Sequence, residues 1–394
     1  MRTVTLQDPA WIKQAKENLR NLYEGRPLMR MPFEFVPYAD IKSKLETDTV
    51  KRSPVTVEEY NRHYFDHELA LQEQLKLYED RSLSEFRDDS VLAITPMNGA
   101  MGWFNEFFGG KNEWFNNRPP FPYHIIREVS QIDSLKPDIS KGDLFRLGLE
   151  QMRYFAEEVG DKIPVQSLDL QSPINFASIL IDYTTLLYMM IDAPEKVHQL
   201  MRMITETLIV SMRMIRKEMV ADWPLSQFSW WMPKGVFMAD DLMAVLNPEL
   251  YAEFGKPYNE MIAEEFGSVS VHSCGKIGHN LENVASTRGM VALNTHESLA
   301  VAAPIIKNRL VLIVGGVNNS VAPNYPGSIR DNLKTGEEVA EFWWNDFASI
   351  PEFKGQRLLY QCHALLGKKR TAQDAYDKML DFSNCLINGN LSEL

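Results

Sequence analysis

The sequence predicts an α/β fold: a (β/α)8 barrel with an N-terminal helical extension and a long insert in its first third. Short apolar runs alternate with longer helical patterns along the 394 residues, which is typical of parallel βα units. This length suits an α/β barrel with insertions. No repeat, low-complexity tract or linker rich in Pro, Gly or Ser divides the chain. We therefore expect a single domain spanning residues 1–394.

The individual elements follow in order. Residues 10–25 have the pattern of an amphipathic helix that precedes the first strand. Eight apolar runs are the expected strands: Pro32–Val36, Val91–Pro96, Pro164–Asp169, Gln227–Trp231, Ser268–His272, Met290–Asn294, Leu310–Gly315 and Arg357–Cys362. Two long helices carry start signals, Asp192–Val220 at Pro194 and Pro248–Phe266 at Asn247-Pro248. Methionines on the first of these helices are expected to fill the core.

Composition argues against several classes of function. The net charge of −12, with no basic stripe, disfavours nucleic-acid binding. The N-terminus has no apolar signal core, and no stretch approaches the length of a membrane span. Three cysteines in a chain of this length fit a reducing compartment better than a disulfide framework. We expect a cytoplasmic protein with no membrane partner.

A short motif after the fifth expected strand predicts a metal site. In His272-Ser273-Cys274-Gly275 the histidine and the cysteine are two residues apart, so a strand presents the imidazole and the thiol on one face. Cys362, at the end of the eighth strand, would add a third soft ligand and leave the fourth position open, as in catalytic zinc sites. The alternative is a buried histidine beside two inert core cysteines.

Barrel enzymes place their catalytic groups at the C-terminal ends of the strands. Asp169 and Glu297 are therefore candidate catalytic residues, as proton donor, fourth zinc ligand or substrate anchor, although each could equally be a cap or a salt-bridge residue. An aromatic segment at 96–110 would form an apolar wall for a flat substrate, or else a packed loop. The candidate substrate-binding residues are Glu34, Trp103, Trp230, Asn294 and His296.

Several stretches together resemble the uroporphyrinogen decarboxylase superfamily over roughly residues 160–380. They are Gln171–Asn175, Asp192–His198, Ala239–Asp241, Asn247–Tyr251 and Phe254–Tyr258, which lead into Val271–Gly275. The resemblance implies a barrel with the Asp-Asp stretch near its mouth, and so adds Asp241 to the catalytic candidates. The decarboxylases proper lack a metal and carry an arginine-rich stretch after the first strand. Met29–Pro37 has no such stretch.

A second branch, the corrinoid-dependent methyltransferases, carries zinc on His-x-Cys and a distant cysteine. His272, Cys274 and Cys362 match that pattern. The resemblance implies Zn²⁺ and a corrinoid as cofactors. No Asp-x-His-x-x-Gly segment occurs in the chain, so the corrinoid must come on a partner protein. The insert, from about residue 38 to 160, resembles that of members that demethylate methoxylated aromatics.

The leading hypothesis is thus a zinc-dependent methyltransferase that moves methyl from an O-methylated, methoxyaromatic substrate to the cob(I)amide of a partner corrinoid protein. One alternative is a methylcobamide:thiol methyltransferase, with a small thiol as acceptor. Others are a metal-free decarboxylase, and a non-catalytic barrel or corrinoid-handling partner with a closed, purely structural zinc. The sequence leaves the fourth zinc ligand and the oligomeric state open.

Overall fold

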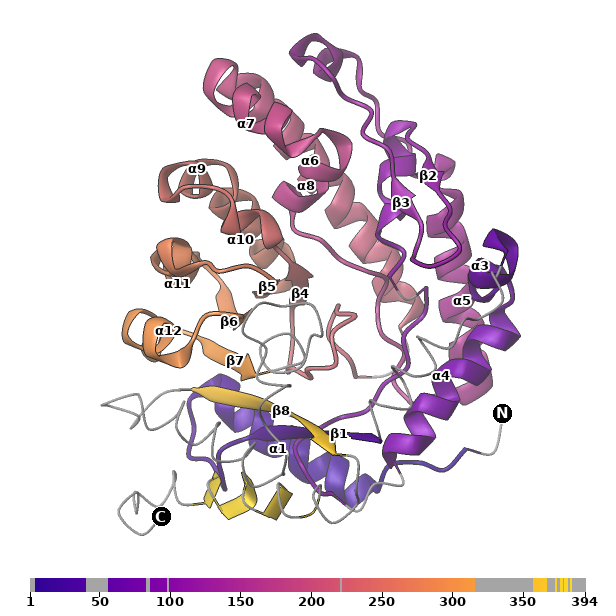
Figure 1. Cartoon of the computed structure of the whole chain (residues 1–394), viewed down its shortest axis with the longest axis vertical. Coiled ribbons are helices and arrows are strands. Elements are labelled where there is room, and N and C mark those ends of the chain that lie inside the picture. The colour runs from indigo at the N-terminus through magenta and orange to yellow at the C-terminus, as the bar shows by residue number, and fades with distance from the viewer. Residues whose placement is uncertain are drawn as a thin grey trace.

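A parallel sheet of six strands forms the frame of the molecule (Figure 1). The computed structural model describes residues 4–39, 56–82, 86–97, 99–219, 222–315 and 357–366, with 373, 376, 377, 379–381, 383 and 384. For 36–39 and 361–366 it describes the backbone alone. The strand order is β1 (Phe33–Ala39), β8 (Leu358–Leu366), β7 (Val311–Gly315), β6 (Met290–Thr295), β5 (Val269–Ser273) and β4 (Val236–Ala239).

Two extended segments, 88–94 and 164–172, close this sheet into a barrel. They are joined to each other and to the sheet by backbone hydrogen bonds from Asp89 to Phe33 (2.8 Å), Ile94 to Pro164 (3.0 Å) and Ala239 to Leu170 (2.9 Å). The segments thereby take the second and third places around the circle. The predicted (β/α)8 barrel is confirmed.

The fourth strand is not where the sequence predicted it. Gln227–Trp231 is a loop, and β4 begins at Val236. The loop folds into the barrel, where Trp230 and Trp231 join one buried cluster with Phe237 and the inward-facing residues of β6, β7 and β8. An aromatic run that would suit a strand fills the barrel interior instead, which is why the apolar pattern was misleading.

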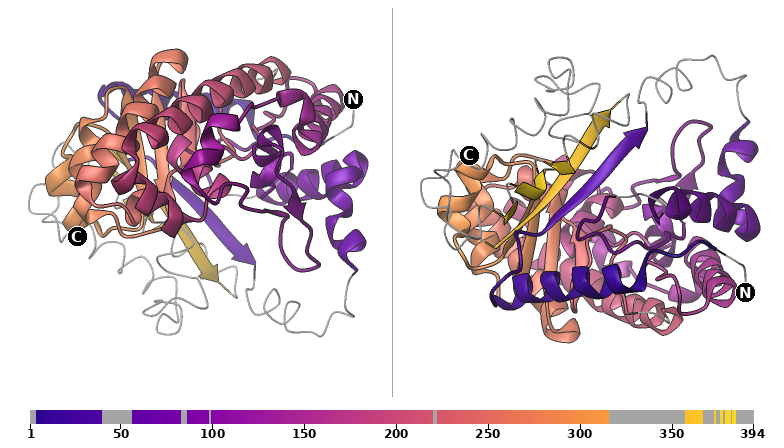
Figure 2. Two further views of the ribbon diagram at one scale, coloured as in Figure 1. Left: turned by 90° about the horizontal axis from the view of Figure 1, so that it is seen from above. Right: turned by 90° about the horizontal axis from the view of Figure 1, so that it is seen from below.

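Helix α1 (Pro9–Glu24) covers the N-terminal end of the barrel (Figure 2). Asp8 caps it by accepting from the Ala10 N–H, at 2.9 Å, and Gly25 ends it in the left-handed conformation that glycine favours. Its buried face packs into the same interior cluster through Trp11, Ala15, Leu19 and Leu22. The predicted N-terminal helix is confirmed.

Helices surround the outside of the barrel: α6 (Pro173–Leu180), α7 (Tyr183–Asp192), α8 (Pro194–Glu218), α9 (Pro248–Phe254), α10 (Lys256–Phe266), α11 (Leu281–Ser286) and α12 (Leu299–Ile306). On α8, Met201 and Met212 are fully buried, as expected of core methionines. The predicted helix over 248–266 is two helices. The chain breaks at Gly255, because Pro257 has no N–H to continue the first helix.

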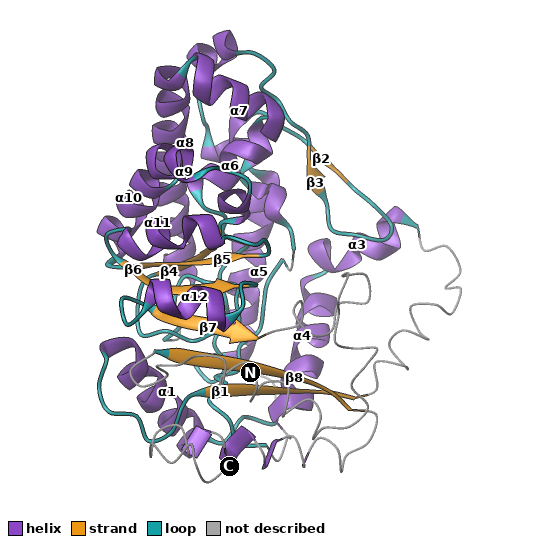
Figure 3. Cartoon of the chain, turned by 60° about the vertical axis from the view of Figure 1, so that its left-hand side comes forward, coloured by secondary structure: helices purple, strands orange, loops and turns teal. Residues whose placement is uncertain are grey.

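The insert lies on the side towards which the strands point (Figure 3). It contains α3 (Val57–Phe65), α4 (His67–Ser82), a hairpin of β2 (Asn112–Glu113) and β3 (Phe121–Pro122), and α5 (Asp143–Val159). Short 3-10 turns join these elements at Met101–Trp103, Asn105–Phe108, Val129–Ser134 and Ile139–Lys141. Among the described residues, no helix has the length and apolar character needed to cross a membrane.

Candidate metal centre

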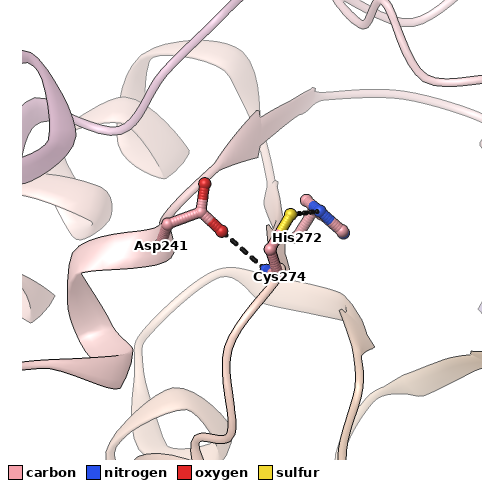
Figure 4. A group of neighbouring side chains, drawn as sticks. All are labelled: Asp241, His272 and Cys274. Atoms are coloured by element: carbon pink, nitrogen blue, oxygen red, sulfur yellow. Dashed lines mark hydrogen bonds between the residues drawn. The ribbon is translucent and has the colours of Figure 1, made fainter. Parts of the chain in front are cut away.

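His272 and Cys274 lie together at the C-terminal end of β5. His272 is opposite Ala239 of β4 and Asn294 of β6, and Cys274 follows the last residue of the strand. The imidazole Nε2 is 3.0 Å from the Cys274 sulfur (Figure 4). The alternation of a strand has therefore brought the two predicted ligands into contact, as the spacing required.

The partner of His272 fixes which ring nitrogen carries the proton. The Asn294 amide nitrogen donates to the Ile313 carbonyl at 2.9 Å, so its oxygen must accept from Nδ1–H of His272, at 2.5 Å. That assignment leaves a lone pair on Nε2, beside the sulfur. Burial also lowers the pKa of His272 and favours the neutral ring. A neutral histidine held in this way is the form that binds metals.

Asp241 adds a carboxylate to the pair. It begins a 3-10 turn, Asp241–Ala244, directly after β4, and its Oδ1 accepts from the Cys274 N–H at 2.6 Å. One ligand atom each from Asp241, His272 and Cys274 lies within 4.8 Å of the other two (Figure 4). One nitrogen, one sulfur and one oxygen donor at this spacing suit a zinc ion better than the oxygen-rich shells of magnesium or calcium.

The environment of Cys274 is unfavourable to a bare thiolate. The residue is exposed, yet partial desolvation of its sulfur and the neighbouring Asp241 carboxylate raise the pKa of the thiol to about 12. A bound cation reverses this effect, because a coordinating thiol loses its proton to the metal. The donor set therefore fits a metal ion.

Cys362, the predicted third ligand, lies on β8 with its Cα opposite that of Phe35 in β1. Its side chain is outside the described residues. The role of Cys362 in the metal site accordingly stays a prediction.

Asp169 lies in the segment between α5 and α6, three residues before Ser172, the N-cap of α6, and the charge of Asp241 acts on it. It is buried, and accepts from the amide of Gln171 at 2.6 Å and from the side chain of Gln227. Burial is the main cause that raises the pKa of Asp169, and the charge of Asp241 adds to it. A carboxyl group of this kind can hold a proton that an exposed aspartate would have lost.

His296 and Glu297 follow β6, beside the turn that contains Cys274. The His296 ring is 5.9 Å from that of His272 and bonds to the backbone of Cys274, and burial lowers its pKa. A carboxylate oxygen of Glu297 accepts from the Gly278 N–H at 2.9 Å, and its other oxygen is 4.0 Å from Lys276. Glu297 thus stabilises the turn after Cys274. This favours the alternative in which Glu297 is a capping or salt-bridge residue rather than a catalytic one.

Two aromatic rings of the interior loop pack beside His272. Phe228 and Trp230 stack at 5.1 Å, and their centroids lie 5.2 and 6.2 Å from that of His272. Trp230, a predicted substrate-binding residue, is therefore near the centre, although it does not end a strand. Phe228 was missed in the sequence, and its place two residues before Trp230 was the available signal.

Two predicted substrate-binding residues lie elsewhere. Glu34 was expected near the C-terminal end of a strand, and that placement is wrong: it is the second residue of β1, which continues to Ala39, and it is buried near the N-terminal end of that strand. Trp103 is buried in the insert, where it stacks on Phe145 and donates from Nε1 to the Asp169 carbonyl at 2.8 Å. These contacts favour the packed-loop interpretation of the aromatic segment.

Replacing Asn294 with alanine is expected to weaken zinc binding by about 10- to 100-fold, because His272 would lose the acceptor that fixes its tautomer. Competition with a chromophoric chelator measures the change. Asn283→Ala is the matched control, since Asn283 donates to the Pro248 carbonyl on the outside of the barrel. Equal zinc affinity in both variants would contradict the assigned role of Asn294.

Comparison with known proteins adds to this geometry. The profile of a family described as uroporphyrinogen decarboxylase (URO-D) matches residues 105–338, a span that includes Asp241, His272 and Cys274 and ends before Cys362. A solved structure of a methyltransferase from Methanosarcina mazei is similar over 93% of this chain and 98% of that chain, with 15% sequence identity and a TM-score of 0.58. At this identity the similarity establishes a shared fold. No curated protein matches the sequence.

Proposed function

The chain belongs to the uroporphyrinogen decarboxylase family, and on that premise we propose that it is a zinc-dependent methyltransferase of a corrinoid system. Its substrate would be an O-methylated, methoxyaromatic compound, and its methyl acceptor the cob(I)amide of a partner corrinoid protein. The observation that carries the proposal is the group of Asp241, His272 and Cys274, whose ligand atoms converge at the mouth of the barrel.

In this proposal His272, Cys274 and Cys362 hold the zinc ion, and Asp241 is the fourth ligand or its nearest carboxylate. The chemistry that the cofactors supply is Lewis-acid activation of the ether oxygen by zinc and acceptance of the methyl group by the cob(I)amide. Asn294 orients His272 through the bond to Nδ1. The exposure of Cys274 supports a site that substrate can reach, unlike a closed structural zinc.

The remaining roles belong to side chains around the metal ligands. Phe228 and Trp230 would form one wall for the flat ring of the substrate, with His296 as a polar contact beside His272. Asp169, a carboxyl group whose pKa is raised, would deliver a proton to the phenolate oxygen as the methyl group leaves. Each residue would thus position the substrate or move a proton.

The metal-free decarboxylase receives no support from the region where its arginines would lie. Arg30, the arginine of the Met29–Pro37 stretch, pairs with the buried Asp89 at 2.6 Å. Its guanidinium also packs on the ring of Phe33, 4.8 Å from the centroid. Arg30 is therefore committed at the N-terminal end of β1, away from the mouth at which a substrate carboxylate would bind.

The test is methyl transfer in vitro. Purified, zinc-loaded protein is mixed with cob(I)alamin and a panel of methoxyarenes, and methylcobalamin is followed by its absorbance. We expect methylcobalamin to form with at least one methoxyarene, and Asp169→Asn to slow it by about 10²- to 10⁴-fold if Asp169 is the proton donor. Failure across the whole panel would contradict the proposal. If the protein instead consumes supplied methylcobalamin when a small thiol is added, the thiol methyltransferase is favoured.

A further inference from the structure

The residues before and after Asp241, Asp240 and Leu242, are both held by hydrogen bonds to buried polar side chains. On one side, the Asp240 carboxylate is fully buried and accepts from the Tyr251 hydroxyl at 2.8 Å and from the Asn259 amide at 2.9 Å. On the other side, the Leu242 N–H donates to the side-chain oxygen of Asn175 at 2.9 Å. Asp241 therefore lies between two fixed points, one on α9 and α10 and one on α6.

The Asn175 amide cannot turn without breaking a second bond. Its nitrogen donates to the Gln171 oxygen at 3.0 Å, and the Gln171 nitrogen donates in turn to the Asp169 carboxylate at 2.6 Å. These three hydrogen bonds all run in one direction, with each donor on the side of Leu242 and each acceptor on the side of Asp169. Because a backbone N–H can only donate, the Asn175 oxygen must be its acceptor, and the orientations of the Asn175 and Gln171 amides follow from that.

We propose that Asn175 is a positioning residue that sets the place of the Asp241 carboxylate at the metal centre. It does so through the Leu242 N–H, without touching the metal ligands. The inference rests on the proposed function, in which Asp241 faces a zinc ion. The carboxylate is already bonded to the Cys274 N–H, so a shift of the turn moves both Asp241 and Cys274. Outer contacts of this kind are worth about 10- to 100-fold in metal affinity.

A purely structural role for Asn175 predicts a different result, and the chain offers a matched control. Asn18 on α1 is also buried; it accepts from the Met29 N–H at 3.3 Å and donates to the Asp89 carboxylate at 3.0 Å. It lies at the opposite end of the barrel from the metal centre. Asn18→Ala should thus cost comparable folding stability and leave the metal site intact.

The experiment compares the wild type, Asn175→Ala, Asn175→Asp and Asn18→Ala as full-length chains. Zinc affinity is measured by chelator competition, and the ligand arrangement by the d–d absorption of the Co²⁺-substituted proteins. We expect Asn175→Ala to bind zinc about 10- to 100-fold more weakly with altered d–d bands. Asn175→Asp keeps an acceptor oxygen for the Leu242 N–H but loses the bond to Gln171, so its zinc affinity should fall between those of the wild type and Asn175→Ala, and Asn18→Ala should match the wild type.

Wild-type zinc affinity and unchanged Co²⁺ bands in Asn175→Ala would overturn the positioning role. So would equal losses in Asn175→Ala and Asn18→Ala, which would reflect general destabilisation. Should Asn175→Ala fail to fold, Asn175→Asp is compared with Asn18→Ala instead. An Asn175→Asp protein that folds but binds no zinc would contradict the proposal. A wild type that binds no zinc contradicts the proposed function itself, so the two failures are distinguishable.

Discussion

His272→Ala is expected to remove zinc binding and methyl transfer together. Among the described residues, the imidazole supplies the nitrogen donor of the centre, and Cys274 is its direct neighbour. The loss should exceed the roughly 100-fold that removal of an outer contact costs, because here a ligand itself is deleted. Metal analysis of the purified variant and the methylcobalamin assay measure the two effects.

His198→Ala is the control for this variant. His198 bonds to Tyr258 and Glu253 on the outer helices, away from the centre. It should retain wild-type zinc and activity. A His272→Ala protein that keeps its full zinc content would show that the metal is held elsewhere.

Trp103→Ala is expected to destabilise the fold by about 3–5 kcal/mol, as is usual when a large buried aromatic side chain is deleted. The ring packs among four phenylalanines, Phe104, Phe107, Phe145 and Phe176, at centroid distances of 5.2 to 5.7 Å. Its removal would leave a cavity and an unpaired Asp169 carbonyl. Chemical denaturation measures the change.

The same position separates a packing role from a substrate-binding role. Trp103→Phe keeps most of the ring contacts and loses the bond to Asp169, so it should cost about 1–3 kcal/mol. A Trp103→Ala protein with nearly unchanged stability but a strongly raised KM for the methoxyarene would contradict the packing role. That result would return Trp103 to the substrate wall predicted from the sequence.

The features that sequence predicted well are those set by local periodicity. The pair of His272 and Cys274 follows directly from the two-residue period of a strand, and β5 begins within one residue of its predicted start. The helix predicted over Asp192–Val220 from its start signal at Pro194 corresponds to α8, Pro194–Glu218. The alternation of such elements was enough to predict the barrel.

The errors arise where tertiary packing overrides a local pattern. Aromatic side chains at 227–231 suit a strand, but they fill the barrel interior. The first strand was expected to end at Val36, whereas β1 continues through Pro37 to Ala39, so Glu34 lies near its start. The orientations of Asn175 and Asn294 depend on partners far away in the chain, Leu242 and Ile313. No spacing rule within a single sequence predicts such bonds.

The zinc content of the full-length protein, prepared without chelator, tests the central claim most directly. It is measured in parallel for Cys362→Ala and for Cys385→Ala, which removes the one cysteine of the sequence not proposed as a ligand. The account predicts about one zinc ion per chain in the wild type and in Cys385→Ala, and its loss in Cys362→Ala. A wild type without zinc, or a Cys362→Ala variant that keeps it, would contradict the three-ligand site and the methyl transfer proposed to depend on it.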